Sequence, residues 1–379
     1  MHRFVLRQER FGGLIFDRQH HTISAVDDRE YTMLQREPRF DVARCAEYQK
    51  GCETLVAPTK VFFVLTKKCN LRCLHCSNDS DPRRDEIIPL STVELLLTEC
   101  QEMGVFEIAI NGGEPLTHPD FFTIVSSIKQ HGFPLYLNTN GVCSRKTLDK
   151  LCDTGIESIK ISFEGLRENH DKIRGKGNFD RALHAVRRLK KAGCHVRLNY
   201  TLMEENRADC FGLVRLADEL ACDLKIAPLI PVGRARSLSP PPYIAGSGFQ
   251  QELDSFCREN RIKISVEMML EMETGNCALV EKGLSYQHTP CGIRHVHLSI
   301  DSDGKAYSTG RQTDFCAELE VGNVYVQSLS AIWQQAAAKN RAAVGRCGFC
   351  SRTDVRTVLG SSFPRTDLHT TLACPMPKG

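Results

Sequence analysis

Three cysteines lie within a span of eight residues, in the sequence Cys69-Asn-Leu-Arg-Cys73-Leu-His-Cys76. Thiolates at this spacing can hold three irons of a cubane [4Fe–4S] cluster, which usually takes four cysteine ligands. A set of three leaves one iron open, as catalytic zinc sites do, and a ligand that offers both an amine and a carboxylate can occupy it. The alternatives are chance clustering or a zinc ion, which would want a fourth ligand, and His75 has little freedom to serve inside so short a loop. We therefore predict a cluster with one open iron.

The elements that must position these cysteines form a repeating pattern of strands and helices. Apolar runs short enough for buried strands occur at 61–66, 106–110, 135–138, 158–163, 196–201 and 224–227. Helical patterns separate them at 95–103, 120–130, 145–152, 179–192 and 209–220. Strands joined by helical crossovers are typical of a parallel α/β sheet, and six units fall short of the eight in a closed barrel. The sequence therefore predicts a partial (β/α)6 barrel.

Residues suited to a small polar ligand follow the predicted strands at their carboxyl ends, where α/β sheets place ligand sites. Glycines in the stretch Asn111-Gly112-Gly113-Glu114-Pro115 let backbone carbonyls approach a ligand closely, and Glu114 can accept a hydrogen bond from an ammonium group. Asn138 ends the third strand and Ser162 the fourth, and the guanidinium of Arg174 can hold a carboxylate. Each is ordinary alone, as a turn or a surface charge. Their convergence on one edge favours a ligand site.

The sequence CNLRCLHC at the end of a first strand resembles the defining motif of the radical SAM superfamily. The resemblance implies that Cys69, Cys73 and Cys76 hold a [4Fe–4S] cluster whose open iron takes the methionine end of S-adenosylmethionine. It also implies a role for each surrounding residue: His75 near the adenine, Asn111-Gly112-Gly113-Glu114-Pro115 at the methionine amino group, Asn138 at the ribose, and Ser162 with Arg174 at the methionine carboxylate.

One residue departs from that pattern. The stretch Ser162-Phe-Glu164-Gly165 resembles the S-x-D-G of the peptide-modifying branch, and Arg174 belongs to a matching H-D-x-x-R stretch. Glu164 stands where the family has Asp. The change is mild, but it leaves the role of Glu164 open.

The chain has 18 cysteines, and five near its end are a second candidate metal site: Cys291, Cys316, Cys347, Cys350 and Cys374. The sequence around them resembles the SPASM domain, the auxiliary-cluster module of several radical SAM maturases. Thr309, Arg356 and Gly360 stand where that family has further cysteines, so a full pair of auxiliary clusters is excluded. We expect one auxiliary [4Fe–4S] cluster, as in the shorter twitch variant, on Cys291, Cys347, Cys350 and either Cys316 or Cys374. Zinc, or no metal, is the alternative.

Four regions are expected along the chain: an N-terminal appendage at 1–58, the barrel core at 59–236, a bridging segment at 237–286 and a degenerate SPASM/twitch-like domain at 287–379. The appendage shows two short strands, 13–17 and 22–26, and a helix at 28–35. It slightly resembles the strand pair of peptide-recognition domains. The bridging segment shows a helix at 249–259 and a strand at 262–266. The last region begins with a predicted hairpin whose turn lies at Asp303-Gly304, followed by a helix at 329–338.

These expectations define a radical SAM enzyme that cleaves S-adenosylmethionine to a 5′-deoxyadenosyl radical and modifies a peptide or protein substrate. The alternatives are a maturase for a tungsten, modified-haem or quinone-type cofactor, and a non-catalytic iron–sulfur or zinc scaffold. We expect a low-potential electron donor such as ferredoxin or flavodoxin. A net charge of +3 is too small to indicate nucleic acid, and no apolar run reaches the length of a membrane span. With no signal-peptide pattern at the start, the cytoplasm is the expected location.

Overall fold

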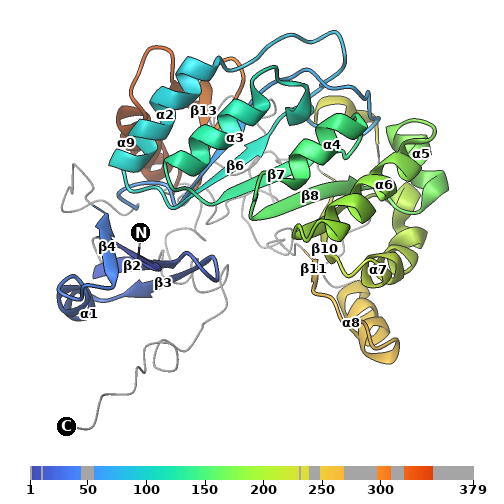
Figure 1. Ribbon diagram of the computed structural model, residues 1–379, viewed down its shortest axis with the longest axis horizontal. Helices are drawn as coiled ribbons and strands as arrows, with labels where there is room; N and C mark the ends of the chain where they lie inside the picture. Colours follow the sequence, from blue (N-terminus) through green and yellow to red (C-terminus); the bar gives the residue numbers. More distant parts are fainter. Residues whose placement is uncertain are drawn as a thin grey trace.

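The computed structural model describes residues 2–9, 12–43, 55–229, 232–238, 248–268, 297–308 and 320–344. Two sheets account for the described strands, a small N-terminal one and a large one that carries the helices (Figure 1). The bridging and C-terminal boundaries that we predict stay predictions, because much of 239–296 and 345–379 lies outside the described residues.

The large sheet confirms the predicted partial barrel. Its central strands run parallel in the order β10-β9-β8-β7-β6-β5. The strands are β5 (Lys60–Val64), β6 (Glu107–Asn111), β7 (Leu135–Thr139), β8 (Ser158–Phe163), β9 (Val196–Leu202) and β10 (Asp223–Pro228). The crossover helices are α2 (Leu90–Glu102), α3 (Phe121–Gln130), α4 (Arg145–Cys152), α6 (Asn178–Lys191) and α7 (Cys210–Glu219).

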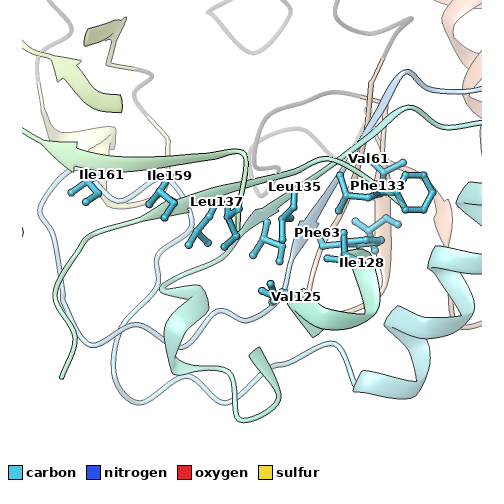
Figure 2. Close-up of a cluster of buried hydrophobic side chains, with 14 of the residues drawn as sticks. Val61, Phe63, Val125, Ile128, Phe133, Leu135, Leu137, Ile159 and Ile161 are labelled. Carbon is cyan, nitrogen blue, oxygen red and sulfur yellow. The ribbon is translucent and has the colours of Figure 1, made fainter. Parts of the chain in front are cut away.

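The helices cover one face of this sheet because alternate strand residues are apolar. Val61, Leu135 and Ile159 pack with α3 residues such as Val125 and Ile128 in one buried cluster (Figure 2). Successive side chains of a strand point to opposite faces. The residues between these apolar positions therefore line the inner face of the partial barrel.

An additional helix, α5 (Arg167–Arg174), lies between β8 and α6 and was not predicted. Its sequence RENHDKIR has almost no apolar periodicity, and only His170 and Ile173 are buried. Residues Glu204–Asp209 and Gly233–Ser237 form short 3-10 helices, η2 and η3, that follow β9 and β10. Helix α8 (Phe249–Glu259) agrees with the prediction.

Strands from the C-terminal half extend the same sheet, which the sequence did not indicate. β12 (His297–Ile300) pairs in parallel with β5, and β11 (Val266–Met268), which starts where the predicted strand 262–266 was to end, pairs with β10. The predicted hairpin is confirmed, because β12 turns antiparallel into β13 (Lys305–Tyr307) at Gly304, whose φ is +83°. β14 (Glu320–Asn323) and α9 (Leu329–Val344) complete this part.

The N-terminal appendage is a four-stranded sheet rather than the predicted strand pair. It has the order β3-β2-β1-β4, with β1 (Phe4–Glu9), β2 (Gly12–Asp17), β3 (Thr22–Val26), β4 (Phe40–Ala43) and the predicted helix as α1 (Asp28–Leu34). Arg7 fastens it to the barrel by donating hydrogen bonds to the carbonyls of Pro58 and Gly104, at 3.0 and 2.9 Å. Because these carbonyls precede β5 and β6, the appendage lies at the amino-terminal end of the barrel.

Candidate functional site

The loop after β5 brings the three predicted cysteines together at the carboxyl end of the sheet. Cys69 and Cys73 are buried, and they pack with Cys76, Leu71 and Val142 in one cluster. Because the loop leaves the strand at the edge where the neighbouring strands also end, the thiols face residues from several crossovers.

Each of the three sulfurs has a nearby hydrogen-bond donor. The Leu71 amide lies 3.4 Å from Cys69 Sγ, the Ser80 amide 3.4 Å from Cys76 Sγ, and Arg174 Nη1 3.7 Å from Cys73 Sγ. N–H donors and a guanidinium favour the thiolate, which is the form that binds metal.

Burial opposes that form when no metal is present. Burial raises the pKa of the Cys69 thiol to about 12, and burial also raises the pKa of Cys73. Loading this site must therefore release protons from the thiols.

The arrangement fits a cluster better than a single ion. Within the described residues, no three His, Cys, Asp or Glu side chains are grouped as a single metal ion would require. In a cubane cluster each cysteine binds a different iron, so the sulfurs need not converge on one point. The cysteine loop also carries one buried polar atom, His75 Nδ1, that has no hydrogen-bond partner in the described chain.

The Gly112-Gly113 turn after β6 lies directly against the cysteine loop. The Gly113 amide donates to the Thr66 carbonyl at 2.6 Å, and the Glu114 amide donates to the Lys68 carbonyl at 2.9 Å. A Cβ on Gly113 would come within 2.4 Å of the Lys68 oxygen, which no side chain tolerates. This close approach explains why glycine is needed there.

Glu114 connects two of the loops at this edge. Its carboxylate accepts hydrogen bonds from Thr139 Oγ1 and the Asn140 amide, both at 2.7 Å, and from the Leu116 amide at 3.2 Å. It is fully buried, and burial raises its pKa even though these donors act against the shift. The sequence predicted an acceptor for an ammonium group, and the structure adds that most of this carboxylate is already used to hold the turn after β7.

Asn111 and Asn138 sit side by side on the inner face, where the Asn138 amide donates to Asn111 Oδ1. They belong to neighbouring strands, β6 and β7, as the prediction required. Asn140 extends the same contact to the metal-binding loop, since its side-chain amide lies 3.8 Å from Cys69 Sγ and donates to Asn70 Oδ1 at 2.9 Å. Asn138, which is predicted to meet the ribose, therefore lies two residues before an amide that contacts the cysteine loop.

Glu164, whose role the sequence left open, is the centre of a buried charge network. Its Oε1 accepts from Arg174 Nη2 at 2.6 Å and from His75 Nε2 at 3.1 Å, and its Oε2 accepts from the Thr201 amide at 3.0 Å. Burial alone would raise the pKa of this carboxyl, but His75 and Arg174 outweigh it and lower the pKa to about 2. The carboxylate is therefore ionised, and it holds the Arg174 guanidinium and the His75 ring in place. Ser162, two residues earlier on β8, lies on the same inner face.

Arg234 is a site residue that the sequence reasoning missed. It reaches from η3 to the cysteine loop, where Nε donates to the Cys73 carbonyl at 2.9 Å and Nη2 to the Ser80 carbonyl at 2.6 Å. Its backbone amide also donates to the Cys76 carbonyl at 3.0 Å, and Gly233 approaches so closely that a Cβ would lie 2.4 Å from the Ser77 oxygen. A Gly-Arg pair just after the last predicted strand was the available signal.

The C-terminal candidate ligands Cys291, Cys316, Cys347, Cys350 and Cys374 all lie outside the described residues. The described hairpin that precedes some of them does approach the site, because Asp301 forms an ion pair with Lys67 at 3.3 Å. No described helix is long and apolar enough to cross a membrane.

The fold and the site define a class: a partial-barrel α/β enzyme with three clustered thiols at the carboxyl edge of its sheet. The family model of the radical SAM superfamily matches residues 63–217. The chain belongs to the radical SAM superfamily and is a radical SAM enzyme. Its domain implies a [4Fe–4S] cluster and S-adenosylmethionine as cofactors.

Relatives with known names agree with this assignment. Mycofactocin maturase MftC of Mycobacterium tuberculosis (strain ATCC 25618 / H37Rv) is 26% identical over 318 residues, or 81% of this chain and 78% of that protein. The AdoMet-dependent heme synthase of Methanosarcina barkeri is 27% identical over 319 residues, or 78% and 88%. The solved structure of Streptococcus suis SuiB bound to precursor peptide SuiA shares the fold, with a TM-score of 0.71, 14% identity and 93% coverage of both chains. This pattern is that of the SPASM/twitch-containing maturase branch.

Proposed function

We propose that this enzyme holds its [4Fe–4S] cluster on Cys69, Cys73 and Cys76 and uses the radical it generates to modify a peptide. When bound, the reduced cluster supplies the electron that cleaves S-adenosylmethionine into methionine and a 5′-deoxyadenosyl radical. The observation that carries the proposal is the set of three adjacent thiols, two of them buried, each with a donor within 3.7 Å of its sulfur.

The surrounding residues bind and orient the cofactor. The backbone of Gly112 and Gly113, pressed against the cysteine loop, faces the methionine amino group, with Asn111, Glu114 and Pro115 shaping that turn. Arg174 and Ser162 hold the methionine carboxylate, and Glu164 keeps the guanidinium in place through its 2.6 Å contact. His75 offers its unpartnered Nδ1 beside the adenine, and Asn138 meets the ribose.

A peptide substrate is supported by the relatives. MftC is named as a mycofactocin maturase, and the similarity spans most of both proteins. SuiB, whose structure matches 93% of this chain, was solved bound to a precursor peptide. We therefore place a peptide or protein substrate on the inner face of the partial barrel, below the cofactor.

A second candidate, maturation of a cofactor, has one specific observation in its favour: the similarity to AdoMet-dependent heme synthase covers 88% of that protein. The two candidates predict different partners. A short precursor peptide that binds the enzyme tightly supports the first. Loss of a neighbouring metalloenzyme's activity when this enzyme is removed supports the second.

Two further parts of the proposal concern electron supply. One auxiliary [4Fe–4S] cluster is held by Cys291, Cys347 and Cys350 with Cys316 or Cys374, and zinc at these residues is the competing occupant. A low-potential donor such as ferredoxin or flavodoxin reduces the enzyme in the cytoplasm.

The decisive test is anaerobic incubation of the reconstituted enzyme with S-adenosylmethionine and dithionite. The wild-type enzyme should form 5′-deoxyadenosine, and the variant with Cys69, Cys73 and Cys76 all changed to Ala should form none. Absence of 5′-deoxyadenosine from the wild-type enzyme would refute the proposal. The same triple variant should retain about four irons on the auxiliary site, and an iron-free variant would refute the second cluster.

A further inference from the structure

The inner face of the large sheet carries charged side chains below the proposed cofactor site. On β8, Ser158, Lys160 and Ser162 share this face, since Ile159 and Ile161 pack toward the helices (Figure 2). The strand register sets Lys160 beside Arg197 of β9. Side chains on the helix-free side of a sheet this curved point into the interior of the barrel.

Most of the charges on this face are paired. Lys60 Nζ lies 2.8 Å from Glu107 Oε2, and Arg197 Nη2 lies 2.8 Å from Glu267 Oε2. Lys225 Nζ lies 3.4 Å from the other oxygen of Glu267. Lys225 and Arg197 thus share one carboxylate.

Lys160 is different, because no ion pair or hydrogen bond of its ammonium is found in the described chain. Two neighbouring side chains also carry a polar atom without a hydrogen-bond partner in the described chain. Arg197 Nε and Ser158 Oγ are both buried without a hydrogen-bond partner there. Buried polar groups in folded proteins nearly always have partners, so the two buried groups beside the half-buried Lys160 call for an explanation.

Electrostatics reinforces the observation. Burial lowers the pKa of Lys160 to about 7, and the positive charges of Lys225, Lys60 and Arg197 act in the same direction, while Glu267 opposes them. The Lys160 ammonium therefore lies among three cationic side chains, Lys225, Lys60 and Arg197, with two carboxylates, Glu107 and Glu267, beside them. This excess of positive charge favours the binding of an anion.

The remaining titratable groups that the structure describes on this face do not supply that negative charge. Tyr136 donates its hydroxyl to Glu107, and burial lowers the pKa of His297 to about 3, which leaves that ring neutral. Asp223 of β10 accepts from the Ser265 amide at 3.0 Å and faces His195 at 3.8 Å.

We infer that Lys160, with Arg197 Nε and Ser158 Oγ, binds a carboxylate of the substrate: an acidic side chain or the C-terminal carboxylate of a peptide. The inference rests on the proposed function and adds the chemical group by which the substrate is recognised. Lys160 lies two residues before Ser162 on β8, and a strand advances about 3.3 Å per residue. The bound carboxylate therefore sits about 7 Å below the proposed methionine-binding level, within a residue or two of the carbon that meets the radical.

The test uses two synthetic pools of N-acetylated random octapeptides, one with free C-terminal carboxylates and one amidated. Each pool is incubated anaerobically with reconstituted enzyme and S-adenosylmethionine, and retained peptides are identified by mass spectrometry. Wild-type enzyme should enrich peptides with Asp or Glu from both pools if a side chain is recognised. It should enrich peptides of the free-acid pool alone if the C-terminal carboxylate is recognised.

Three variants make the result specific. Lys160→Met should lose the enrichment at least ten-fold, because a charge-assisted hydrogen bond is removed. Lys160→Arg should still enrich acidic peptides at pH 9, because the guanidinium stays charged. The wild-type enzyme should lose the enrichment at that pH, because the Lys160 ammonium deprotonates. Lys191→Met, at the exposed end of α6, should behave as wild type. Equal retention of acidic peptides by wild type and Lys160→Met, or no acidic enrichment by wild type, overturns the inference.

Two further measurements separate the possible failures. Lys160→Met should still form 5′-deoxyadenosine with dithionite, because Lys160 lies outside the cofactor site; failure of the wild-type enzyme to do so would refute the proposed function instead. Without peptide, Lys160→Met should fold at least as stably as wild type, because the substitution removes a positive charge that lies among three other cationic side chains. A ten-fold loss in its folding equilibrium would show that a carboxylate of the chain itself already pairs with Lys160, and would also overturn the inference.

Discussion

Arg174 and Glu164 form a buried ion pair, with Nη2 and Nε of the arginine at 2.6 and 3.1 Å from Glu164 Oε1. The remaining guanidinium nitrogen, Nη1, lies 3.7 Å from Cys73 Sγ. One carboxylate directly after β8 therefore determines how a cation from α5 meets a thiol from the loop after β5. His75 binds the same oxygen from that loop, so Glu164 joins three segments of the site.

Glu164→Gln should destabilise the cluster-free protein by about 3–5 kcal/mol, because it leaves the buried Arg174 guanidinium without its carboxylate. The pKa of Glu164 is lowered from 4.5 to about 2, so its contribution is complete above about pH 4.5. It is lost as the pH falls toward 2. The stability difference between wild type and Glu164→Gln, measured by urea unfolding at several pH values, should shrink over that range. A difference that is independent of pH would contradict this assignment.

Glu164→Asp is the matched control, because it keeps the negative charge and changes only the length of the side chain. It restores the residue that the family motif carries, but its side chain is one methylene shorter. We expect it to recover more than half of the lost stability while lowering S-adenosylmethionine affinity, because Arg174 must shift to keep its contact. Isothermal titration with S-adenosylmethionine checks the second part. Full recovery of both properties would show that the length of residue 164 is unimportant.

Gly113→Ala should impair iron loading and 5′-deoxyadenosine formation at least ten-fold. Its new Cβ would lie 2.4 Å from the Lys68 carbonyl oxygen and 2.7 Å from that of Lys67, both backbone atoms that cannot move without displacing the cysteine loop. Gly212→Ala is the control, because a Cβ there meets only the flexible Leu166 side chain at 2.9 Å. Alanine at this position should slightly increase the stability of helix α7, because alanine has a higher helix propensity than glycine. Equal activity of the two variants would contradict the role given to the Gly113 approach.

Arg234→Ala should lower iron retention and accelerate loss of the cluster in air. The substitution removes a guanidinium that holds the carbonyls of Cys73 and Ser80, at a cost of about 2–3 kcal/mol. Arg236→Ala, on the same short helix but exposed, should have no effect. The measurement is iron content and the rate of bleaching of cluster absorbance. Bleaching of Arg234→Ala at the wild-type rate would show that Arg234 does not position the loop.

Arg7→Met should loosen the N-terminal sheet from the barrel. Arg7 is fully buried, pairs with Glu9 at 2.8 Å and lies over the Phe106 ring at 4.5 Å. Leaving Glu9 buried without its partner costs about 3–5 kcal/mol. Limited proteolysis should cut the N-terminal region faster than in wild type or in the control Arg29→Met, an exposed position on α1. Unchanged cleavage would show that other contacts dominate.

The sequence by itself determined the central features of this protein. The cysteine spacing, the strand–helix alternation and the glycine turn each depend on neighbouring residues, so local pattern was enough to predict the partial barrel and the family. β1 and β4 were missed because their pairing is decided by partners distant in the chain. β12 was predicted as part of a hairpin, but its pairing with β5, across more than 230 residues, was missed for the same reason.

Only the tertiary structure decided how the charges are shared. In the sequence, Glu164 is a mild variant of a family motif. Packing places it between His75 and Arg174, and these two side chains lower its pKa against the effect of burial. Arg234 carried no recognisable spacing, and its role follows from where η3 returns to the cysteine loop. Lys160 is one of many lysines in the sequence, and only the register of β8 with β9 places it on the inner face beside Arg197. Its ammonium has no ion pair with any residue that the structure describes. Charge pairing is a property of distances in space, which local sequence does not encode.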